Sequence, residues 1–464
     1  MGDYKYQIAT FNLFDYAGVE KHLESMAAKG WRFDSIGSIF WKYKKAEPAK
    51  LKYSVTYIPE SSEFDPEPLE KQKDIEAYCE EAGWKKAGNW MQMQIFCSEN
   101  QDAVPIETDE ELRLNYIHKS MKKNFLTSHL LLFFVFLINM GTQFSTAKRN
   151  PVEFLSDSSR LWTCGIILWG ILLLLFDVVY YYIWMRSAKW AVTEGYRCPE
   201  PKGYRYWNRL GWCVLLVLIV GMFSSYTSGM VWFMVVYLVS LFLIIWAVRK
   251  AQQKMKAEGF SKQSNVTLSI ILCVILTFVL LGGMTAVILM ADISLTKDRK
   301  AVDSILVNGR EWEIYQDELP LYVKDLAEIE LSSNSCEARE QSTFLVGYGD
   351  YSEYLFDGAE AKTVTVANNY EVIDVKADFL YEFILKAFYS RELRYWDDEE
   401  KEKVEFRVVY ENENGKICRQ YCEGLPVVHD WLILTENKII SMELYLDDDL
   451  TEEQMKILIE KFAE

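Results

Sequence analysis

Residues 266–291 read VTLSIILCVILTFVLLGGMTAVILMA, a run of 26 residues without a charged side chain. A helix needs about 20 apolar residues to cross the hydrocarbon core of a bilayer, so this run predicts a membrane-spanning helix. Four earlier runs have the same character, at residues 125–143, 161–185, 211–227 and 230–248. Within all five runs Asp177 is the only acid, and Lys and Arg do not occur. We therefore expect about five transmembrane helices between residues 125 and 291.

The third and fourth runs are separated only by Ser228 and Gly229. This spacing fits a tight hairpin of two spanning helices. A re-entrant hairpin that does not cross the membrane is the alternative, and it would leave fewer spans.

The distribution of Lys and Arg predicts the orientation of the chain, because these residues are enriched in cytoplasmic loops. With a cytoplasmic N-terminus, the flanks and loops on the cytoplasmic side hold 14 Lys and Arg, and those on the other side hold 6. An odd number of spans then places the C-terminal residues outside the cell. We expect a multi-pass protein of the plasma membrane with an extracytoplasmic C-terminal domain, although one span fewer would return that domain to the cytoplasm.

Charge is sorted along the chain in a way that separates the domains. Residues 292–464 carry 19 Lys and Arg against 40 Asp and Glu, whereas residues 125–291 carry 14 against 6. The pattern predicts a soluble domain at 1–115, a linker at 116–124, the membrane region at 125–291 and an acidic α+β domain at 300–464. Direct binding of nucleic acid is not expected, because phosphate contacts require a basic surface.

The N-terminal domain contains two similar halves. In the first half a strand at 4–11 precedes a helix at 16–29, and Gly30-Trp31 follows the helix. In the second half a strand at 51–58 precedes a helix at 67–82, and Gly83-Trp84 follows it. Glycine commonly ends a helix, and an aromatic, alternating stretch after each Gly-Trp predicts a further strand. This order predicts a ferredoxin-like βαββαβ sandwich.

These residues resemble a known family. The duplicated Gly-Trp pairs, the strand Phe40-Trp41-Lys42-Tyr43 and the spacing of Tyr53 and Tyr57 are similar to domain-of-unknown-function family 2812, over roughly residues 1–115. The resemblance implies a Gram-positive bacterial source and a membrane-linked regulatory role. It also implies a PadR-type transcriptional regulator, encoded nearby, as a partner. The family has no assigned catalytic residues.

The aromatic residues of the N-terminal domain are candidates for an interaction surface. Trp41, Tyr43, Tyr53 and Tyr57 would line such a groove on the sheet. The alternative is that these rings pack against the helices, which is the commoner role of large aromatic residues in a sheet.

Asp177 is the candidate functional residue of the membrane region. An ionisable group within a membrane helix by default indicates a buried pair or an ion path. The alternative is a position near the cytoplasmic end of the helix, where Asp177 reaches lipid headgroups or Arg186. The neighbouring Tyr180, Tyr181, Tyr182 and Trp184 favour that interfacial position, because aromatic residues gather at membrane surfaces.

Motifs for catalysis, cofactors and metals do not occur. The nine Cys and four His form no Cys-x-x-Cys or His-Glu-x-x-His pattern, and we find no Gly-rich phosphate loop. A disulfide among Cys336, Cys418 and Cys422 stays open if their domain is extracytoplasmic. Catalytic, cofactor-binding and metal-binding residues are therefore not assigned.

Together these patterns favour a non-enzymatic membrane regulator or sensor that relays an envelope or ligand signal to a cytoplasmic protein. A homo-oligomer is compatible with this role. The alternative is a component of a membrane transport system that uses the helical bundle, with Asp177 in its path.

Overall fold

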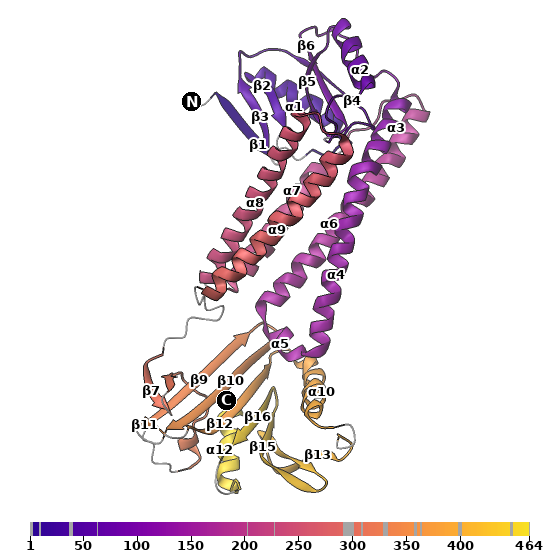
Figure 1. Cartoon of the computed structure of the whole chain (residues 1–464). Helices are drawn as coiled ribbons and strands as arrows, with labels where there is room; N and C mark the ends of the chain where they lie inside the picture. Colours follow the sequence, from indigo (N-terminus) through magenta and orange to yellow (C-terminus); the bar gives the residue numbers. More distant parts are fainter. Residues whose placement is uncertain are drawn as a thin grey trace. The chain divides into compact units, whose positions relative to one another are not determined.

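The computed structural model (Figure 1) describes the chain in segments, which are residues 3–8, 11–36, 40–62, 64–201, 203–226, 228–290, 301–307, 310–327, 333–356, 360–361, 364–397, 401–445 and 449–463. The chain forms two compact units. Met1–Ile138, Ile166–Ile219 and Ser228–Ile293 make up the first unit. Asn139–Gly165, Val220–Thr227 and Ser294–Glu464 make up the second. Helices of the membrane region thus contribute residues to both units.

The N-terminal domain consists of two successive strand–helix–strand–strand units. The first contains β1 (Tyr4–Ile8), α1 (Tyr16–Ala28), β2 (Trp31–Ile36) and β3 (Phe40–Lys45). The second contains β4 (Lys52–Tyr57), α2 (Glu70–Glu81), β5 (Lys85–Trp90) and β6 (Met93–Ser98). Each unit forms its own three-stranded antiparallel sheet, in the orders β1-β3-β2 and β4-β6-β5. Each is therefore a split β-α-β arrangement.

The predicted single βαββαβ sheet is not formed, because β4 starts a second sheet. One edge of β4 faces α1. The backbone N–H groups of Val55 and Tyr53 donate hydrogen bonds to the carboxylates of Glu20 (2.8 Å) and Glu24 (3.2 Å). Side chains of a helix thus satisfy the strand edge that another strand would otherwise pair with.

The two predicted helix ends are confirmed. Gly30 and Gly83 have φ angles of +78° and +83°, directly after the last turns of α1 and α2. A residue with a side chain adopts such angles at a cost, whereas glycine does not. The duplicated Gly-Trp pattern therefore reflects two equivalent helix ends.

The membrane region contains long helices, and among the described residues five segments are long and apolar enough to cross a membrane. These are Glu110–Arg149, Ser158–Thr193, Tyr204–Ser224, Met234–Ala257 and Lys262–Gly283. They belong to α3 (Glu110–Ser120), a π-helical segment (Met121–Leu126), α4 (Thr127–Arg149), α6 (Ser158–Thr193), α7 (Tyr204–Ser224), α8 (Ser228–Ala257) and α9 (Lys262–Met290).

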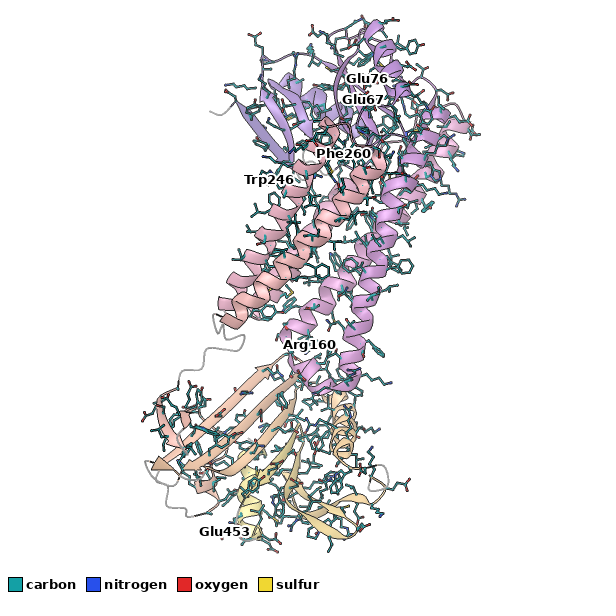
Figure 2. All side chains as sticks on the ribbon, viewed as in Figure 1. Glu67, Glu76, Arg160, Trp246, Phe260 and Glu453 are labelled. Carbon is teal, nitrogen blue, oxygen red and sulfur yellow. The ribbon has the colours of Figure 1, made fainter. Side chains whose placement is uncertain are left out.

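The helices expose large apolar side chains, as expected of a surface in contact with lipid. Leu131, Trp246 and Phe278 are 66%, 53% and 71% exposed, and Figure 2 labels Trp246 on α8. The predicted linker, 116–124, is helical and continuous with α4. The last residue of the fifth predicted span, 291, lies outside the described residues.

The C-terminal domain is α+β, as predicted. Its main sheet has seven strands in the order β13-β14-β15-β16-β12-β10-β9, all antiparallel. The strands are β9 (Ser333–Ser342), β10 (Val346–Phe356), β12 (Val364–Val375), β13 (Val404–Asn412), β14 (Gly415–Cys422), β15 (Leu425–Thr435) and β16 (Lys438–Leu444). A smaller sheet pairs β7 (Asp303–Val307) with β8 (Arg310–Ile314) and β11 (Glu360–Ala361).

Two helices cover the main sheet from opposite faces. Helix α12 (Glu452–Ala463) buries Leu458, Ile459 and Phe462 in one core cluster, with Tyr370 and Ile433 of the sheet. Helix α10 (Tyr381–Glu392) buries Ile384 and Phe388 in another, with residues of the opposite sheet face. The short helix α5 (Pro151–Ser156), between α4 and α6, contributes Val152 to this second cluster.

Candidate functional site

A short loop of the N-terminal domain, residues 11–15, docks on the membrane helices. It follows β1 and ends at Asp15, whose Oδ1 accepts a hydrogen bond from the backbone N–H of Gly18 (3.1 Å) and so caps α1. We call this loop, together with its contacts on α6 and α7 and the side chains hydrogen bonded to them, the N-terminal interface.

Phe14 is the apolar centre of the N-terminal interface. Its side chain is fully buried. Its ring centroid lies 4.9 Å from that of Trp184, 5.6 Å from Tyr181 and 5.7 Å from Tyr204. Aromatic pairs at such distances each contribute about 0.5–1.5 kcal/mol beyond their buried area. A single residue of the soluble domain is therefore held by rings from two membrane helices.

Asp177 lies next to Phe14's aromatic neighbours and is hydrogen bonded to the same loop through Tyr204. The Tyr204 hydroxyl donates to Asp177 Oδ1 (2.8 Å), and the Asn12 side-chain amide donates to the Tyr204 hydroxyl (3.0 Å). The other carboxylate oxygen of Asp177 lies 3.3 Å from His129 Nε2 of α4. The carboxylate thus connects three helices with the N-terminal domain.

His129 joins the start of α4 to Asp177. Its Nδ1 lies 2.9 Å from the backbone carbonyl oxygen of Phe125, and its Nε2 lies 3.3 Å from Asp177 Oδ2. The imidazole ring is therefore held between its own helix and α6.

A charged contact closes the N-terminal interface beside this network. Asp15 Oδ2 lies 3.4 Å from Arg205 Nε, and the Asp15 side chain is 1% exposed. Burial raises the pKa of Asp15 to about 6, and the Arg205 guanidinium opposes the shift. Near neutral pH this carboxylate is therefore close to its titration range.

The second half of the N-terminal domain docks through the equivalent loop, which follows β4. Lys123 of the π-helical segment donates to the carbonyl oxygens of Pro59 (3.0 Å), Glu60 (3.2 Å) and Ser61 (3.1 Å). Lys262 of α9 lies 2.9 Å from Asp65. The duplicated unit thus uses the same strand-to-helix loop twice, and a π-helical segment, which is frequent at functional sites, lies at the second contact.

The C-terminal domain has an attachment of its own to α4 and α6. Thr343 Oγ1, in the β9–β10 turn, donates to the backbone carbonyl of Leu155 (2.6 Å), and Ser158 Oγ donates to that of Ser342 (3.1 Å). Val152 is packed in the same apolar cluster as Phe388 of α10. We call this contact between residues 149–158 and the C-terminal domain the α5 interface.

The predicted functional acid is thus part of a docking network rather than isolated. Asp177 is paired with Tyr204 and His129, and not with Arg186 as the interfacial alternative proposed. The sequence predicted a functional role for the acid itself. It did not predict roles for Asn12 or Tyr204, because an Asn in a loop and a Tyr at a helix start are common in any sequence.

The four predicted surface aromatics are core residues. Trp41, Tyr43, Tyr53 and Tyr57 are 4%, 0%, 3% and 2% exposed, and they belong to one buried cluster. The packing alternative therefore describes them. Tyr57 nevertheless supports the N-terminal interface, because its hydroxyl donates to the backbone carbonyl of Leu13 (2.6 Å).

The exposed aromatic face of the first sheet is the opposite one. Tyr4, Tyr6, Ile8 and Phe40 are 45%, 61%, 59% and 45% exposed. In the sheet register Tyr4 lies opposite Lys44, Tyr6 opposite Lys42, and Ile8 opposite Phe40. Side chains alternate between faces along a strand, so Trp41 and Tyr43 point inwards while Phe40 and Lys42 point outwards. We call this aromatic and basic surface the outer sheet face.

The cysteines are free thiols in the described chain. A disulfide from Cys336 to Cys418 or Cys422 is excluded by the sheet order, since β9 and β14 are five strand spacings apart. At about 4.8 Å per spacing this is roughly 24 Å, far beyond the reach of a disulfide.

Comparison with known proteins supports the family resemblance. The model of the family described as "Protein of unknown function (DUF2812)" matches residues 15–130, about a quarter of the chain. The match runs from the cap of α1 to the first turn of α4, so it includes the docking loop after β4 but only Asp15 of the docking loop at 11–15. The resemblance predicted from the duplicated Gly-Trp pattern is therefore confirmed for this part. Neither the curated proteins nor the solved structures gave a match to the chain.

Proposed function

We propose that this chain is a non-enzymatic membrane regulator that relays the state of its C-terminal domain to a soluble partner bound by its N-terminal domain. The observation that carries the proposal is that α4 and α6 take part in both attachments. At the N-terminal interface α6 contacts Phe14 through Tyr181 and Trp184, and α4 is joined to α6 through His129 and Asp177. Their second attachment is the α5 interface, which lies between the same two helices in the chain.

A rigid attachment at each interface makes such a relay physically reasonable. Phe14 is enclosed by rings, and Asn12, Tyr204 and Asp177 form a continuous hydrogen-bonded chain. A shift or rotation of α6 relative to α7 would break or displace these contacts. Packed interfaces of this kind have discrete arrangements, so a small helix movement becomes a change in the attached domain.

The outer sheet face is the surface that we assign to the soluble partner. It combines exposed aromatic rings with the ammonium groups of Lys44 and of Lys42, the latter ion-paired with Asp34 (3.1 Å), and so fits a partner with an acidic, partly apolar surface. A PadR-type regulator, suggested by the family resemblance, is the specific candidate. The N-terminal domain then lies in the cytoplasm, as the excess of 14 over 6 Lys and Arg supports. With five spans the acidic domain is extracytoplasmic.

In-cell photocrosslinking of the full-length chain tests this function. A photoreactive amino acid replaces Tyr6 of the outer sheet face, and a matched variant carries it at Tyr78, an equally accessible tyrosine of α2 (61% and 72% exposed). We expect a soluble cytoplasmic protein to crosslink to position 6 and not to position 78. Equal crosslinking from both positions, or none from position 6, would contradict the assignment.

A transport component is the second candidate, and the His129–Asp177 pair favours it. Neighbouring His and Asp side chains within a membrane helix bundle are a common element of proton paths. The carboxylate is, however, also bound by Tyr204, which connects it with the N-terminal domain. Proton uptake by proteoliposomes that contain the chain separates the candidates. Transport predicts a proton flux that Asp177→Asn abolishes, whereas the relay predicts no flux above that of empty liposomes.

A further inference from the structure

The main sheet of the C-terminal domain has one covered edge and one open edge. At β9 the edge is covered by the segment that follows β8. The Cys336 N–H donates to the carbonyl oxygen of Tyr315 (2.8 Å), and the Asp317 N–H donates to that of Cys336 (3.1 Å). Strand β13 forms the other edge, and within the described part of the chain no strand pairs with its outer side. An uncovered edge offers backbone donors and acceptors to another strand.

The backbone of β13 presents every second residue to this open edge. At the start of the strand the Glu423 N–H donates to the carbonyl oxygen of Lys403 (3.4 Å), so the backbone of Lys403 is directed towards β14. In an antiparallel strand the N–H and C=O groups of successive residues point to opposite sides. The backbone groups of Val404, Phe406 and Val408 therefore point outwards, where each supplies a donor and an acceptor.

The side chains along this edge are suited to contact with another strand. Val408 is 50% exposed, and Val404 and Phe406 are half-buried. Glu405 and Arg407 form an ion pair with each other, and both side chains are 50% exposed. Both can therefore accept a further partner without a change in their own strand.

Arg407 has an unfavourable neighbour within the sheet. It lies directly opposite Arg419 of β14, and like charges in this position destabilise a sheet. Arg419 is held by Asp449 (3.0 Å) and by the ring of Trp431 (4.9 Å). A second carboxylate beside Arg407 would reduce the remaining repulsion.

The sequence of the edge is complementary to itself in the antiparallel direction. Residues 404–408 read Val-Glu-Phe-Arg-Val. When a second copy pairs about Phe406, Glu405 lies opposite Arg407 and Val404 lies opposite Val408. Opposite-charge, aromatic and β-branched pairs of this kind each stabilise a sheet. The three outward-pointing residues of each copy form pairs that exchange two hydrogen bonds, which gives about six bonds in all.

Other registers are less favourable. An axis at Val408 would place Glu405 opposite Glu411, which is a like-charge pair. It would also include the β-bulge between Val408 and Tyr410, where the regular part of the strand ends. The axis at Phe406 uses only the regular part.

We propose that β13 is the contact site for a second copy of this chain, which pairs antiparallel with it about Phe406 and continues the main sheet into the second copy. The ion pair of Glu405 and Arg407 is kept, and it joins the same two residues of the second copy in one charge cluster. A contact in which both copies use the same surface closes as a dimer. The pairing is independent of the relay, because it does not involve the N-terminal interface.

Charge exchange tests the pairing on the full-length chain purified in detergent. Arg407→Glu and Glu405→Arg each convert the cross-strand charge pairs into like-charge pairs. Each variant alone should dimerise about tenfold more weakly than the wild-type chain. Size-exclusion chromatography with light scattering over a range of concentrations measures this difference. The double variant, Glu405→Arg with Arg407→Glu, should regain wild-type dimerisation.

A mixture of the two single variants separates contacts between chains from contacts within one chain. The Arg407→Glu chain carries acids at both positions, and the Glu405→Arg chain carries bases at both. Differently tagged chains of the two variants should therefore form mixed dimers as readily as the wild type. Glu413→Arg is the matched control, because it makes the same change of charge in the exposed turn between β13 and β14. It should leave dimerisation at the wild-type level.

Crosslinking locates the axis of the dimer. Phe406 meets its own counterpart, so Phe406→Cys should be joined to itself by a short bifunctional thiol reagent. In Glu411→Cys the two thiols would lie about ten residues apart along the paired strands, or about 33 Å, and should not be joined. The wild-type chain, with its nine cysteines, sets the background. Thermal melting checks that each variant is folded, since the Phe406 ring packs on Tyr389 (4.9 Å).

A wild-type chain that stays monomeric over the concentration range would overturn the proposal. Single charge variants that dimerise like the wild type, or that form no mixed dimers, would do the same. A crosslink from position 406 to a different protein, with none between copies, would assign the edge to another occupant and would also overturn the proposal.

Discussion

Removal of one oxygen atom from the N-terminal interface should loosen the attachment of the soluble domain. The change is Tyr204→Phe, which keeps the ring in contact with Phe14 and deletes the hydroxyl. That hydroxyl donates to Asp177 (2.8 Å) and accepts from Asn12 (3.0 Å). Its loss therefore leaves both groups without this partner.

The expected magnitude follows from the two bonds. A hydrogen bond to a charged group contributes about 1.5–3 kcal/mol, and one between neutral groups about 1 kcal/mol. The closed interface should thus be destabilised by about 2–4 kcal/mol, which raises the population of its open form at least about thirtyfold. Asp177→Asn combined with Tyr204→Phe should cost less than the sum of the two single changes, because the first weakens and the second removes the same bond.

Cys198 provides the assay, because its thiol lies in the buried cluster that includes the docking loop and is 7% exposed. Burial, aided by Glu110, raises the pKa of this thiol to about 12, so it is unreactive in the closed interface. Maleimide labelling of Cys198 in membrane vesicles, quantified by mass spectrometry, then reports the open fraction. Tyr204→Phe should accelerate labelling at least about thirtyfold.

The control is Tyr206→Phe, two residues further along α7, where the tyrosine is 69% exposed. This change should leave the labelling rate at the wild-type value. Equal labelling of the wild-type and Tyr204→Phe chains would refute the structural role of the hydroxyl. Full additivity of the Asp177 and Tyr204 changes would refute their coupling.

Three further predictions concern the interfaces. Phe14→Ala removes a fully buried ring, and by analogy with other core Phe→Ala changes it should cost about 3–5 kcal/mol and accelerate labelling of the reporter thiol more than any hydrogen-bond variant. Burial raises the pKa of Asp15 to about 6 and that of Glu20 to about 7, from 3.8 and 4.5, so the folded domain binds more protons than the unfolded chain between these values. The contribution of these two groups to stability should therefore be greatest below about pH 4 to 5 and fall as the pH rises through 6 and 7. Thermal melting of the full chain should show a lower Tm at pH 8 than at pH 5.5. The double change Asp15→Asn and Glu20→Gln should reduce this difference in Tm. Thr343→Val deletes the hydroxyl that donates to the α5 carbonyl (2.6 Å) and should increase hydrogen exchange in the β9–β10 turn and α5 without changing the N-terminal domain.

Structural features that depend only on residues close together in the chain were predictable from the sequence. The five apolar helices follow from uninterrupted hydrophobic runs, and the ends of α1 and α2 follow from glycines with positive φ. The family match over residues 15–130 confirms the same local pattern. The strands β9 and β10, which are the edge strand of the main sheet and its neighbour, were not predicted. Their sequences contain many polar residues and two glycines, which weaken the strand signal.

The candidate site was predictable only in part. Asp177 was visible because a carboxylate stands out in an apolar run. The sequence did not predict which face of β3 points inwards. The alternation in Phe40-Trp41-Lys42-Tyr43 defines two faces but does not show which one packs on α1. The predicted aromatic groove therefore lay on the buried side, and the outer sheet face was identified only once the register of β1 and β3 was known.

The sequence of this protein specifies its membrane helices, its duplicated N-terminal units and its acidic C-terminal domain, because hydrophobicity, helix ends and charge are local properties of the chain. Tertiary structure alone decides that Glu20 closes the edge of β4, and that Asp177 meets His129, 48 residues away, and Tyr204, 27 residues away. Asn12 and Tyr204 are separated by 192 residues. Contacts over such separations depend on how the packed elements fit together, and that fit is a property of the folded whole rather than of any one segment.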